Sequence, residues 1–169
     1  MVFDSNLTFE QQLFLGIYQL FFRQQYTSDG KEKAMQMMYL LSLSDMALPK
    51  YEFSMQEYPY SAGFYLFLTQ LDRKGLDIDR FYNNVDLRNK VLADYKVKIL
   101  ELRKSLKLLE HVDDFVSWLG LLSTIAYVSH VQLPAAGDDL VRESVLLKLH
   151  SSYAVENYSD AFHCVSLLP

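Results

Sequence analysis

Residues 31–76 constrain the fold most, because a helical segment, an extended strip and a turn follow one another there. A helix is expected from about Lys31, with Met35 and Met38 on its buried side. It should stop at Ala47-Leu48-Pro49, since the residue before a proline is steered away from helical angles. Apolar and polar residues then alternate over 51–56, which predicts a short extended strip.

A proline-containing corner, Tyr58-Pro59-Tyr60-Ser61, follows the strip, and Pro59 forbids a long helix across it. Ser61 is a good N-cap for the next helix, and Gly75 is a natural C-cap for its end. These signals predict two helices that are joined by a short extended segment and a turn.

The remaining segments are mostly helical by their apolar spacing. Thr8 with Gln11 resembles a capping box that opens the first helix, which fades at the turn formers of residues 27–30. A loop over 76–85 precedes one long helix over about 86–109, and a helix that is apolar nearly all round follows residues 112–114 as the central core element. Asp138 should cap a short helix to about residue 150, and Asn157 or Ser159 should open the last one. The prediction is a mainly α fold: a compact multi-helix domain, with room for one short β element.

Composition fits one folded domain over residues 1–169, because half of the residues are apolar and 22% are charged. No apolar run approaches the roughly 18 residues of a membrane span, and the first residues lack the basic and apolar regions of a secretory signal. A single cysteine, Cys164, leaves no internal disulfide and fits a reducing compartment. We therefore expect a cytoplasmic protein without a membrane partner.

Charge is unevenly distributed along the chain. Residues 88–107 hold seven basic and two acidic side chains, a net charge of +5, although the whole chain carries −5. Such asymmetry indicates either a surface for nucleic acid or an acidic protein, or simply a solvated helix face. The residues of the nucleic-acid alternative share one side of the expected helix: Arg88, Lys96, Arg103 and Lys107.

Motifs of catalysis, metal binding and cofactor binding are missing from the sequence. The histidines His111, His130, His150 and His163 do not pair at metal-ligand spacing, and no glycine-rich phosphate loop or nucleophile elbow occurs. Acidic pairs such as Asp113-Asp114 are explained by the dipole at a helix start. We expect no metal, no cofactor and no enzymatic activity. An enzyme of unassigned class stays open, since catalytic residues can lie far apart in sequence.

Aromatic residues are concentrated beside the corner. Tyrosine combines apolar area with a hydroxyl group and is favoured where a surface meets a partner. Two readings of Tyr58 and Tyr60 stay open, a binding surface or the rim of the core, whereas the phenylalanines are assigned to the core. The aromatic group falls within 17 positions: Tyr51, Phe53, Tyr58, Tyr60, Phe64, Tyr65 and Phe67.

Taken together, these patterns resemble the YwgA-like proteins, which are related to the SocA, or Panacea, antitoxin domain. The resemblance spans about residues 10–168 and rests on the pattern Gln36-x-x-Tyr39-Leu40-Leu41, the corner, Leu68-x-x-Leu71, Lys74-Gly75-Leu76, the helix Trp118 to Tyr127, and Tyr158-Ser159-Asp160-x-Phe162. Tyr58 stands where that family has glycine, and Met37 where it has lysine.

This resemblance implies a mostly helical, non-enzymatic protein of bacterial or phage origin, whose antitoxin relatives neutralise a toxin by binding it. From the resemblance and the aromatic residues we predict a protein-binding module that neutralises or regulates a partner protein. The predicted partner-binding surface consists of Gln36, Tyr39, Tyr58, Tyr60 and Ser61. Gln36 and Tyr39 are three apart on one helical face, so we expect them to line one groove with the corner.

Overall fold

The computed structural model describes residues 6–169, and residues 1–5, which contributed to the argument against a secretory signal, lie outside this part. The predicted mainly α fold with one short β element is confirmed. The elements are α1 (Phe9–Phe22), a 3-10 turn (Ser28–Gly30), α2 (Lys31–Ser42), β1 (Ser54–Met55), β2 (Pro59–Tyr60), α3 (Ala62–Asp72), α4 (Gly75–Asn83), α5 (Val85–Leu92), α6 (Lys96–Ser105), the 3-10 segment η2 (Leu108–Asp114), α7 (Phe115–Tyr127), the π-helical turn η3 (Val128–Gln132), α8 (Asp138–Leu149) and α9 (Ser152–Ser166).

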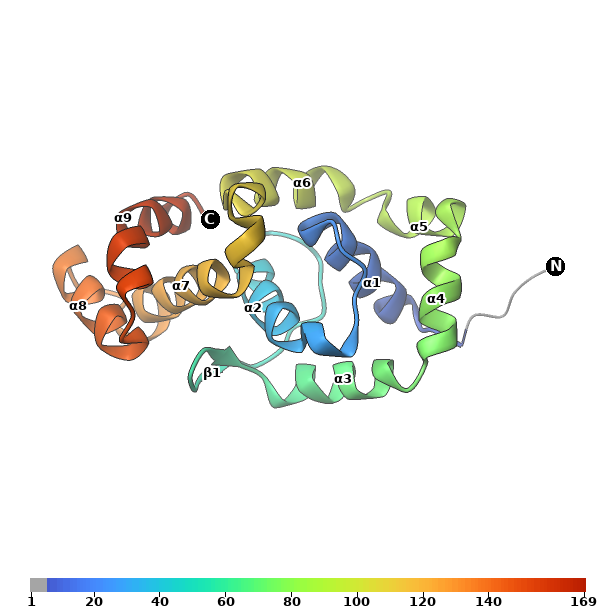
Figure 1. Ribbon diagram of the computed structural model, residues 1–169, viewed down its shortest axis with the longest axis horizontal. Coiled ribbons are helices and arrows are strands. Elements are labelled where there is room, and N and C mark those ends of the chain that lie inside the picture. The colour runs from blue at the N-terminus through green and yellow to red at the C-terminus, as the bar shows by residue number, and fades with distance from the viewer. Residues whose placement is uncertain (1–5) are drawn as a thin grey trace.

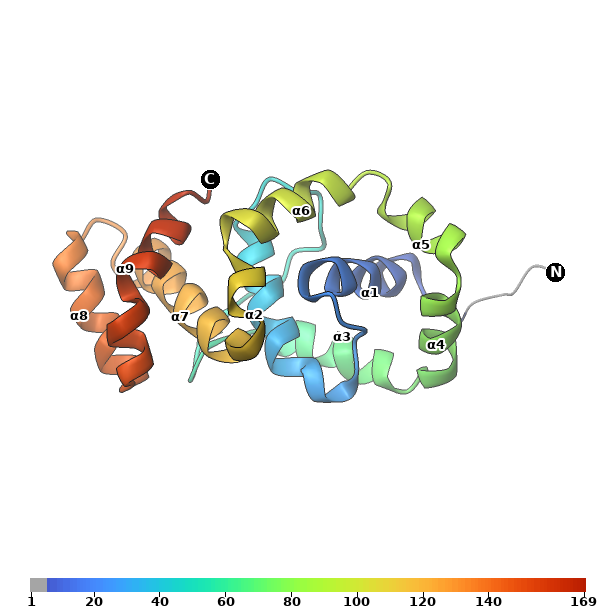
Figure 2. The same cartoon turned by 45° about the horizontal axis from the view of Figure 1, so that its top comes forward.

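The helices form two connected groups around α2 and α7, which pack against each other at the middle of the molecule (Figure 1). On one side, α3, α4, α5 and α6 surround α1, and the view in Figure 2 shows the same ring. On the other side, α8 and α9 pack against α7. The two-stranded antiparallel sheet pairs Ser54 with Tyr60 and Met55 with Pro59, and β2 is its inner strand, in contact with α2 and α7.

Aromatic side chains dominate the core around α1. Phe14 lies in edge-to-face geometry against the rings of Tyr26, Phe64 and Phe67, at centroid distances of 5.1–5.7 Å. The buried Tyr82 hydroxyl donates to the Leu15 carbonyl at 3.0 Å and accepts from the Tyr26 amide at 2.9 Å. A buried tyrosine tip needs such partners, so the hydrogen bonds let this large ring enter the core.

Two predicted helix starts are confirmed by their caps. The Gln11 amide donates to Thr8 Oγ1 at 3.1 Å, and the Thr8 amide donates to Gln11 Oε1 at 2.9 Å, which completes the capping box. Ser61 Oγ accepts from the Phe64 amide at 3.2 Å and starts α3 as expected. The predicted core helix is also confirmed, since Trp118 and Ile125 of α7 are fully buried.

Helix ends between residues 42 and 85 differ from the prediction. Helix α2 ends at Ser42 rather than near Ala47. The hydroxyl groups of Ser42 and Ser44 donate to carbonyls of its last turn, at 2.5 and 2.6 Å, and so compete with further helical bonds. The predicted loop over 76–85 is mostly helix α4, whose Ile78, Phe81 and Tyr82 are buried.

Gly75 is the first residue of α4 and not the C-cap of α3, which is Arg73. The predicted single helix over 86–109 is likewise wrong, because α5 ends at Leu92 and α6 begins at Lys96. The break lets both short helices pack against α1. A single straight helix would move away from α1 after a few turns. Helix α6 is then terminated by Lys107, whose φ of 53° lies in the left-handed region.

The last two helices also begin differently from the prediction. Gly137, not Asp138, is the N-cap residue of α8. Helix α9 begins at Ser152, several residues before the predicted Asn157 or Ser159, because Ser151 Oγ accepts from the Ala154 amide at 3.3 Å.

Candidate functional site

Gln36 and Tyr39, two of the five predicted binding residues, lie inside the molecule. Their exposed fractions are 1% and 3%. A Cβ placed on Gly120 of α7 would stand 3.5 Å from Gln36 Nε2, so this side chain faces α7. The Tyr39 ring packs 5.2 Å from Phe53 and 5.8 Å from Tyr127. The expectation that these two residues belong to an accessible surface is therefore wrong, because the helix face they share is the one that packs on α7.

Ser61 is also buried, with an exposed fraction of 1%. Its amide donates to the Met35 sulfur at 3.3 Å, and its hydroxyl caps α3. Both polar groups of Ser61 are thus used within the protein. The serine therefore positions the corner between β2 and α3.

Tyr58 and Tyr60 remain at the surface, each half-buried. The Tyr60 ring lies 6.0 Å from Tyr65, over which Lys31 Nζ stands at 5.5 Å from the ring centre. Burial raises the pKa of the Tyr58 hydroxyl, and the carboxylates of Glu32 and Glu57 raise it further. This part of the predicted site is therefore aromatic and has acidic neighbours.

A groove runs beside Tyr60, between the extended segment and the start of α3, and we call its lining the hairpin groove. Tyr51 contributes to the groove, although its ring also packs 5.1 Å from Phe64 in the core. Gly63 leaves one wall without a side chain. The first turn of α3 forms one wall of the groove, and the extended segment that includes β1 forms the other. Its lining residues are 50–54, 56 and 60–63.

The four basic residues of the nucleic-acid alternative do not form one free cationic surface. Arg88 donates to the Tyr82 carbonyl at 2.6 Å, and Arg103 donates to the Leu20 carbonyl at 2.8 Å. Both guanidinium groups therefore tie α5 and α6 to neighbouring segments. Lys96 is exposed, and Lys107 stands 3.9 Å from the carboxylate of Asp160.

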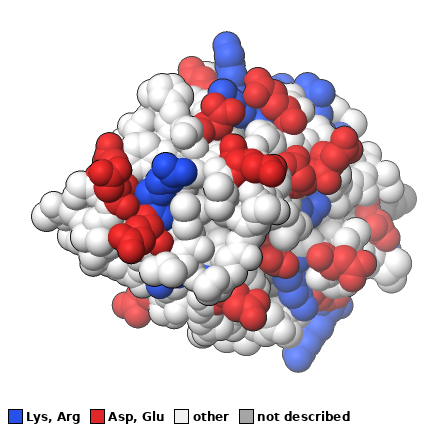
Figure 3. All heavy atoms as spheres, turned by 60° about the vertical axis from the view of Figure 1, so that its left-hand side comes forward, with Lys and Arg blue, Asp and Glu red and all other residues white. Residues whose placement is uncertain are grey.

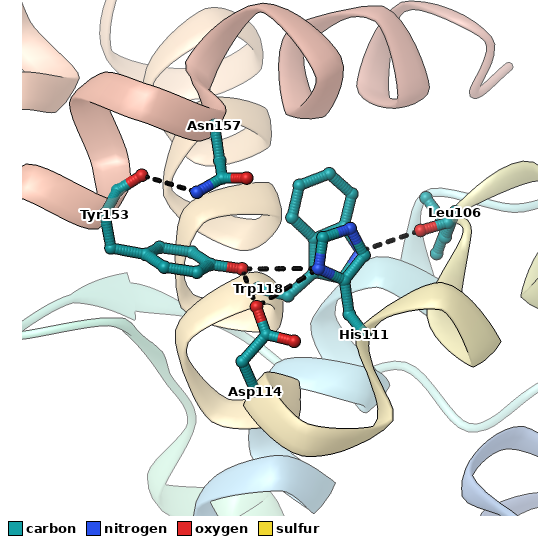
Figure 4. Close-up of polar contacts among 6 residues, drawn as sticks. All are labelled: Leu106, His111, Asp114, Trp118, Tyr153 and Asn157. Carbon is teal, nitrogen blue, oxygen red and sulfur yellow. Dashed lines mark hydrogen bonds and ion pairs between the residues drawn. The ribbon is translucent and has the colours of Figure 1, made fainter.

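A polar cluster that the sequence did not predict joins η2 to α9 (Figure 4). His111 Nδ1 lies 3.1 Å from Asp114 Oδ2, and the Tyr153 hydroxyl donates to the same oxygen. The His111 ring stacks on Trp118 at 3.8 Å between centroids, with 7° between the planes. The Trp118 indole N–H donates to the Leu106 carbonyl at 2.8 Å, and the Asn157 amide donates to the Tyr153 carbonyl at 2.9 Å.

The electrostatics of this cluster follow from its hydrogen bonds. Burial alone would raise the pKa of Asp114, yet the bonds from Tyr153 and His111 hold that pKa below its ordinary value. Burial and the Asp114 charge together raise the pKa of Tyr153. A neutral tyrosine and an ionised aspartate are thus the stable pair at neutral pH.

The polar atoms of the cluster point at one another, as Figure 4 shows, so its geometry is that of a structural joint. The spacing of His111 and Asp114, three residues apart, was the only signal of it in the sequence. Tyr153 comes 39 residues later and gave no signal. Cys164 is a free, buried cysteine, and burial raises the pKa of its thiol, which disfavours the nucleophilic thiolate.

Comparison with known proteins returned nothing: no family model, no curated protein and no solved structure matches this chain. Among residues 6–169, no three or more His, Cys, Asp or Glu side chains are placed to hold a metal ion. Within the same residues, no helix has the length and apolar character needed to cross a membrane.

Proposed function

We propose that this protein is a non-enzymatic protein-binding module of antitoxin-like type, which neutralises or regulates a partner protein by occupying it. The hairpin groove is the observation that carries the proposal. Within it, half-buried tyrosines stand beside a wall that Gly63 leaves open. Tyrosines of this kind bring large contact area and a hydroxyl at small entropic cost, and they are enriched at interfaces.

The contact surface in this proposal is narrower than the one predicted from sequence. It consists of the groove residues Tyr51, Tyr60 and Gly63 together with Tyr58, which lies beside the groove on the same hairpin, while Gln36 and Tyr39 are buried behind it. The resemblance to the antitoxin domain supports a toxin as the partner and the cytoplasm of a bacterial or phage-infected cell as the place of action.

Affinity purification of the tagged protein from its native cells, with and without nuclease treatment, tests the proposal. One stoichiometric protein that survives nuclease treatment is the expected result. Replacing both half-buried tyrosines, as Tyr58→Ala with Tyr60→Ala, should weaken binding at least roughly tenfold, as loss of interface tyrosines does. The melting temperature should stay nearly unchanged.

A matched control is Leu76→Ala, which removes a side chain that is 76% exposed on α4 without touching the groove. This variant should bind like the natural protein. A large loss of stability in the tyrosine variant would show that Tyr58 and Tyr60 belong to the core, and the site assignment would fail.

The second candidate function is a nucleic-acid-binding regulator, which the net charge of +5 over residues 88–107 favours. Arg88 and Arg103 count against it, since both donate to backbone carbonyls. Phosphate binding should weaken steeply with salt and with Lys96→Glu. Absence of binding to nucleic acid at low salt would eliminate this candidate.

A further inference from the structure

The extended segment of the hairpin is longer than the sheet that it joins. Exposure alternates strictly along residues 50–56, with the even-numbered residues exposed and the odd-numbered ones half-buried, as in a strand with one solvated face. In this segment β1, Ser54–Met55, is the part that pairs with β2. Among the described residues, no hydrogen bond reaches the backbone N–H or C=O groups of residues 50–53. These four residues therefore continue the strand-like alternation without a neighbouring strand.

The register shows which side of this segment is open. The Gln56 amide donates to the Tyr58 carbonyl at 3.2 Å, and hydrogen-bonded pairs alternate along an antiparallel ladder, so Ser54 also turns its N–H and C=O groups toward β2. Glu52, two residues earlier in the same extended segment, turns these groups to the same side. Continuing the register places Ala62 opposite Glu52, but Ala62 is already the first residue of α3. The position that a longer β2 would occupy is the hairpin groove.

The opposite wall of the groove offers further backbone donors. Ser61 Oγ accepts from the Phe64 amide, which leaves the two amides before it at the start of α3. These are the amides of Ala62 and Gly63, and helix geometry gives the first amides of a helix no partner within it. Both residues are exposed, and Gly63 has no side chain to cover the wall. Both walls thus present backbone groups that only water or another molecule can satisfy.

Charge does not select the occupant of this groove, since its lining holds one basic and one acidic side chain, Lys50 and Glu52. Charge is no clearer guide at the far end of the molecule. Acidic and basic side chains lie beside one another on the face seen in Figure 3, and on α8 the exposed Arg142 is next to the exposed Glu143. The unpaired backbone groups are the more specific feature, because their complement is the backbone of another peptide.

We propose that the hairpin groove binds an extended peptide segment of the partner protein, which pairs its backbone with Glu52 and so takes the place that β2 leaves. A strand added in this way gains main-chain hydrogen bonds whatever its sequence, while pockets beside it distinguish alternate side chains. Tyr60, at the end of the existing ladder, and Gly63 border the added strand. The inference rests on the proposed function, because it names the kind of segment by which the partner is bound.

Short peptides selected from a random phage-displayed library against the full chain provide the probe. In the free chain the Glu52 amide should exchange rapidly with deuterium, and bound peptide should slow this exchange at least roughly tenfold. Failure to select any peptide, or a bound peptide that leaves the Glu52 amide unprotected, would overturn the inference. Protection that rises with the protein's own concentration, without peptide, would show that a second copy fills the groove and would overturn it as well.

N-methylation of a selected peptide tests the strand without altering the protein. Only alternate residues of a paired strand direct their N–H groups to a given neighbour, so a methyl group on every second amide should weaken binding roughly tenfold, while those between are tolerated. Loss at every third or fourth position, which is the pattern of a helix, would overturn the proposal. Equal effects at all positions would overturn it too.

Glu52→Pro and Glu52→Ala form a matched pair of variants. Both remove the same exposed side chain, but only proline also removes the N–H group. Glu52→Pro should bind the selected peptides roughly tenfold more weakly than Glu52→Ala. Circular dichroism should show that both variants are folded, and equal binding by two folded variants would overturn the inference.

The same variants separate failure of this inference from failure of the proposed function. If Tyr58→Ala with Tyr60→Ala weakens partner binding but Glu52→Pro binds the partner as well as Glu52→Ala does, the groove is the contact site and the strand pairing is wrong. If neither the tyrosine variant nor Glu52→Pro changes partner binding, the groove is not the contact site. The proposed function then fails, and this inference fails with it.

Discussion

Gly63→Gln should make the protein more stable and its partner binding weaker, a combination that few binding-site changes produce. Gly63 is the second residue of α3, and its φ is not positive, so the backbone does not require glycine there. A Cβ at this position would meet Tyr51 Cδ1 at 3.5 Å and Ser61 Oγ at 3.8 Å, both ordinary van der Waals distances. The fold therefore accepts a side chain, whereas the groove loses its open wall.

The magnitude of the stability change follows from helix propensity. Replacing an exposed helical glycine stabilises by about 0.5–1 kcal/mol, because glycine loses the most backbone entropy on folding. For a chain of this length that corresponds to a rise of roughly 1–4 °C in melting temperature. Differential scanning calorimetry measures this rise, and titration with the partner captured from native cells should show binding at least roughly tenfold weaker.

Gly63→Ala is the graded control for this prediction. It adds one carbon, so it should give a similar gain in stability while most of the partner binding remains. Two results would refute the reasoning. A melting temperature several degrees below that of the natural protein would mean that the wall is closely packed, and full binding by Gly63→Gln would mean that the groove is not the contact site.

Three further predictions concern stability, each measured by denaturant unfolding. Gly30→Ala should lower the free energy of unfolding by about 1–2 kcal/mol, because the added Cβ would overlap the buried Tyr18 hydroxyl oxygen and stand 3.2 Å from Tyr18 Cζ. Tyr18→Phe removes that oxygen, so the double variant should recover part of the lost stability. Strictly additive effects of the two substitutions would contradict this explanation. Tyr153→Phe should cost about 1 kcal/mol at pH 7, a modest value because the Asp114 side chain is 34% exposed. Since the pKa of Asp114 is lowered in the folded protein, the stability that its carboxylate contributes is present above pH of about 4 and is lost as pH falls through the folded-state pKa. The stability lost in Tyr153→Phe should therefore become smaller in acid. A loss that stays the same at all pH values would refute the assigned hydrogen bond. His150→Gly should stabilise by about 1 kcal/mol, because φ at the end of α8 is 43°, and a loss of stability would show that the His150 side chain makes a needed contact.

The sequence predicted those helix boundaries that depend on nearby residues. Thr8 and Gln11 satisfy each other's backbone amides three residues apart, and Ser61 caps the amide of Phe64 in the same way. The core character of α7 was predictable too, since apolar residues occupy nearly every side of it. Boundaries decided by distant partners were missed. The break between α5 and α6 follows from wrapping around α1, which local spacing does not record.

In the candidate site, too, the features that depend on nearby residues were predicted and those that depend on distant contacts were missed. Tyr58 and Tyr60 were predicted as surface residues because aromatic residues gather beside a proline, and both lie half-buried at the surface. Gln36 and Tyr39 were correctly placed on one helical face, but only the packing of α2 on α7 determined that this face is buried. The joint of His111, Asp114 and Tyr153 depends on a contact across 39 residues.

By itself, the sequence determined that the chain is helical, where several helices start, and which residues are apolar enough for a core. It could do so because capping and helical spacing act over three or four residues. Only the tertiary structure decided which of two possible faces each helix buries, where the hairpin groove opens, and that α8 keeps Leu140 and Leu147 in solvent. Those outcomes depend on side chains that meet from distant parts of the chain, and burial is a property of the assembled helices rather than of any one segment.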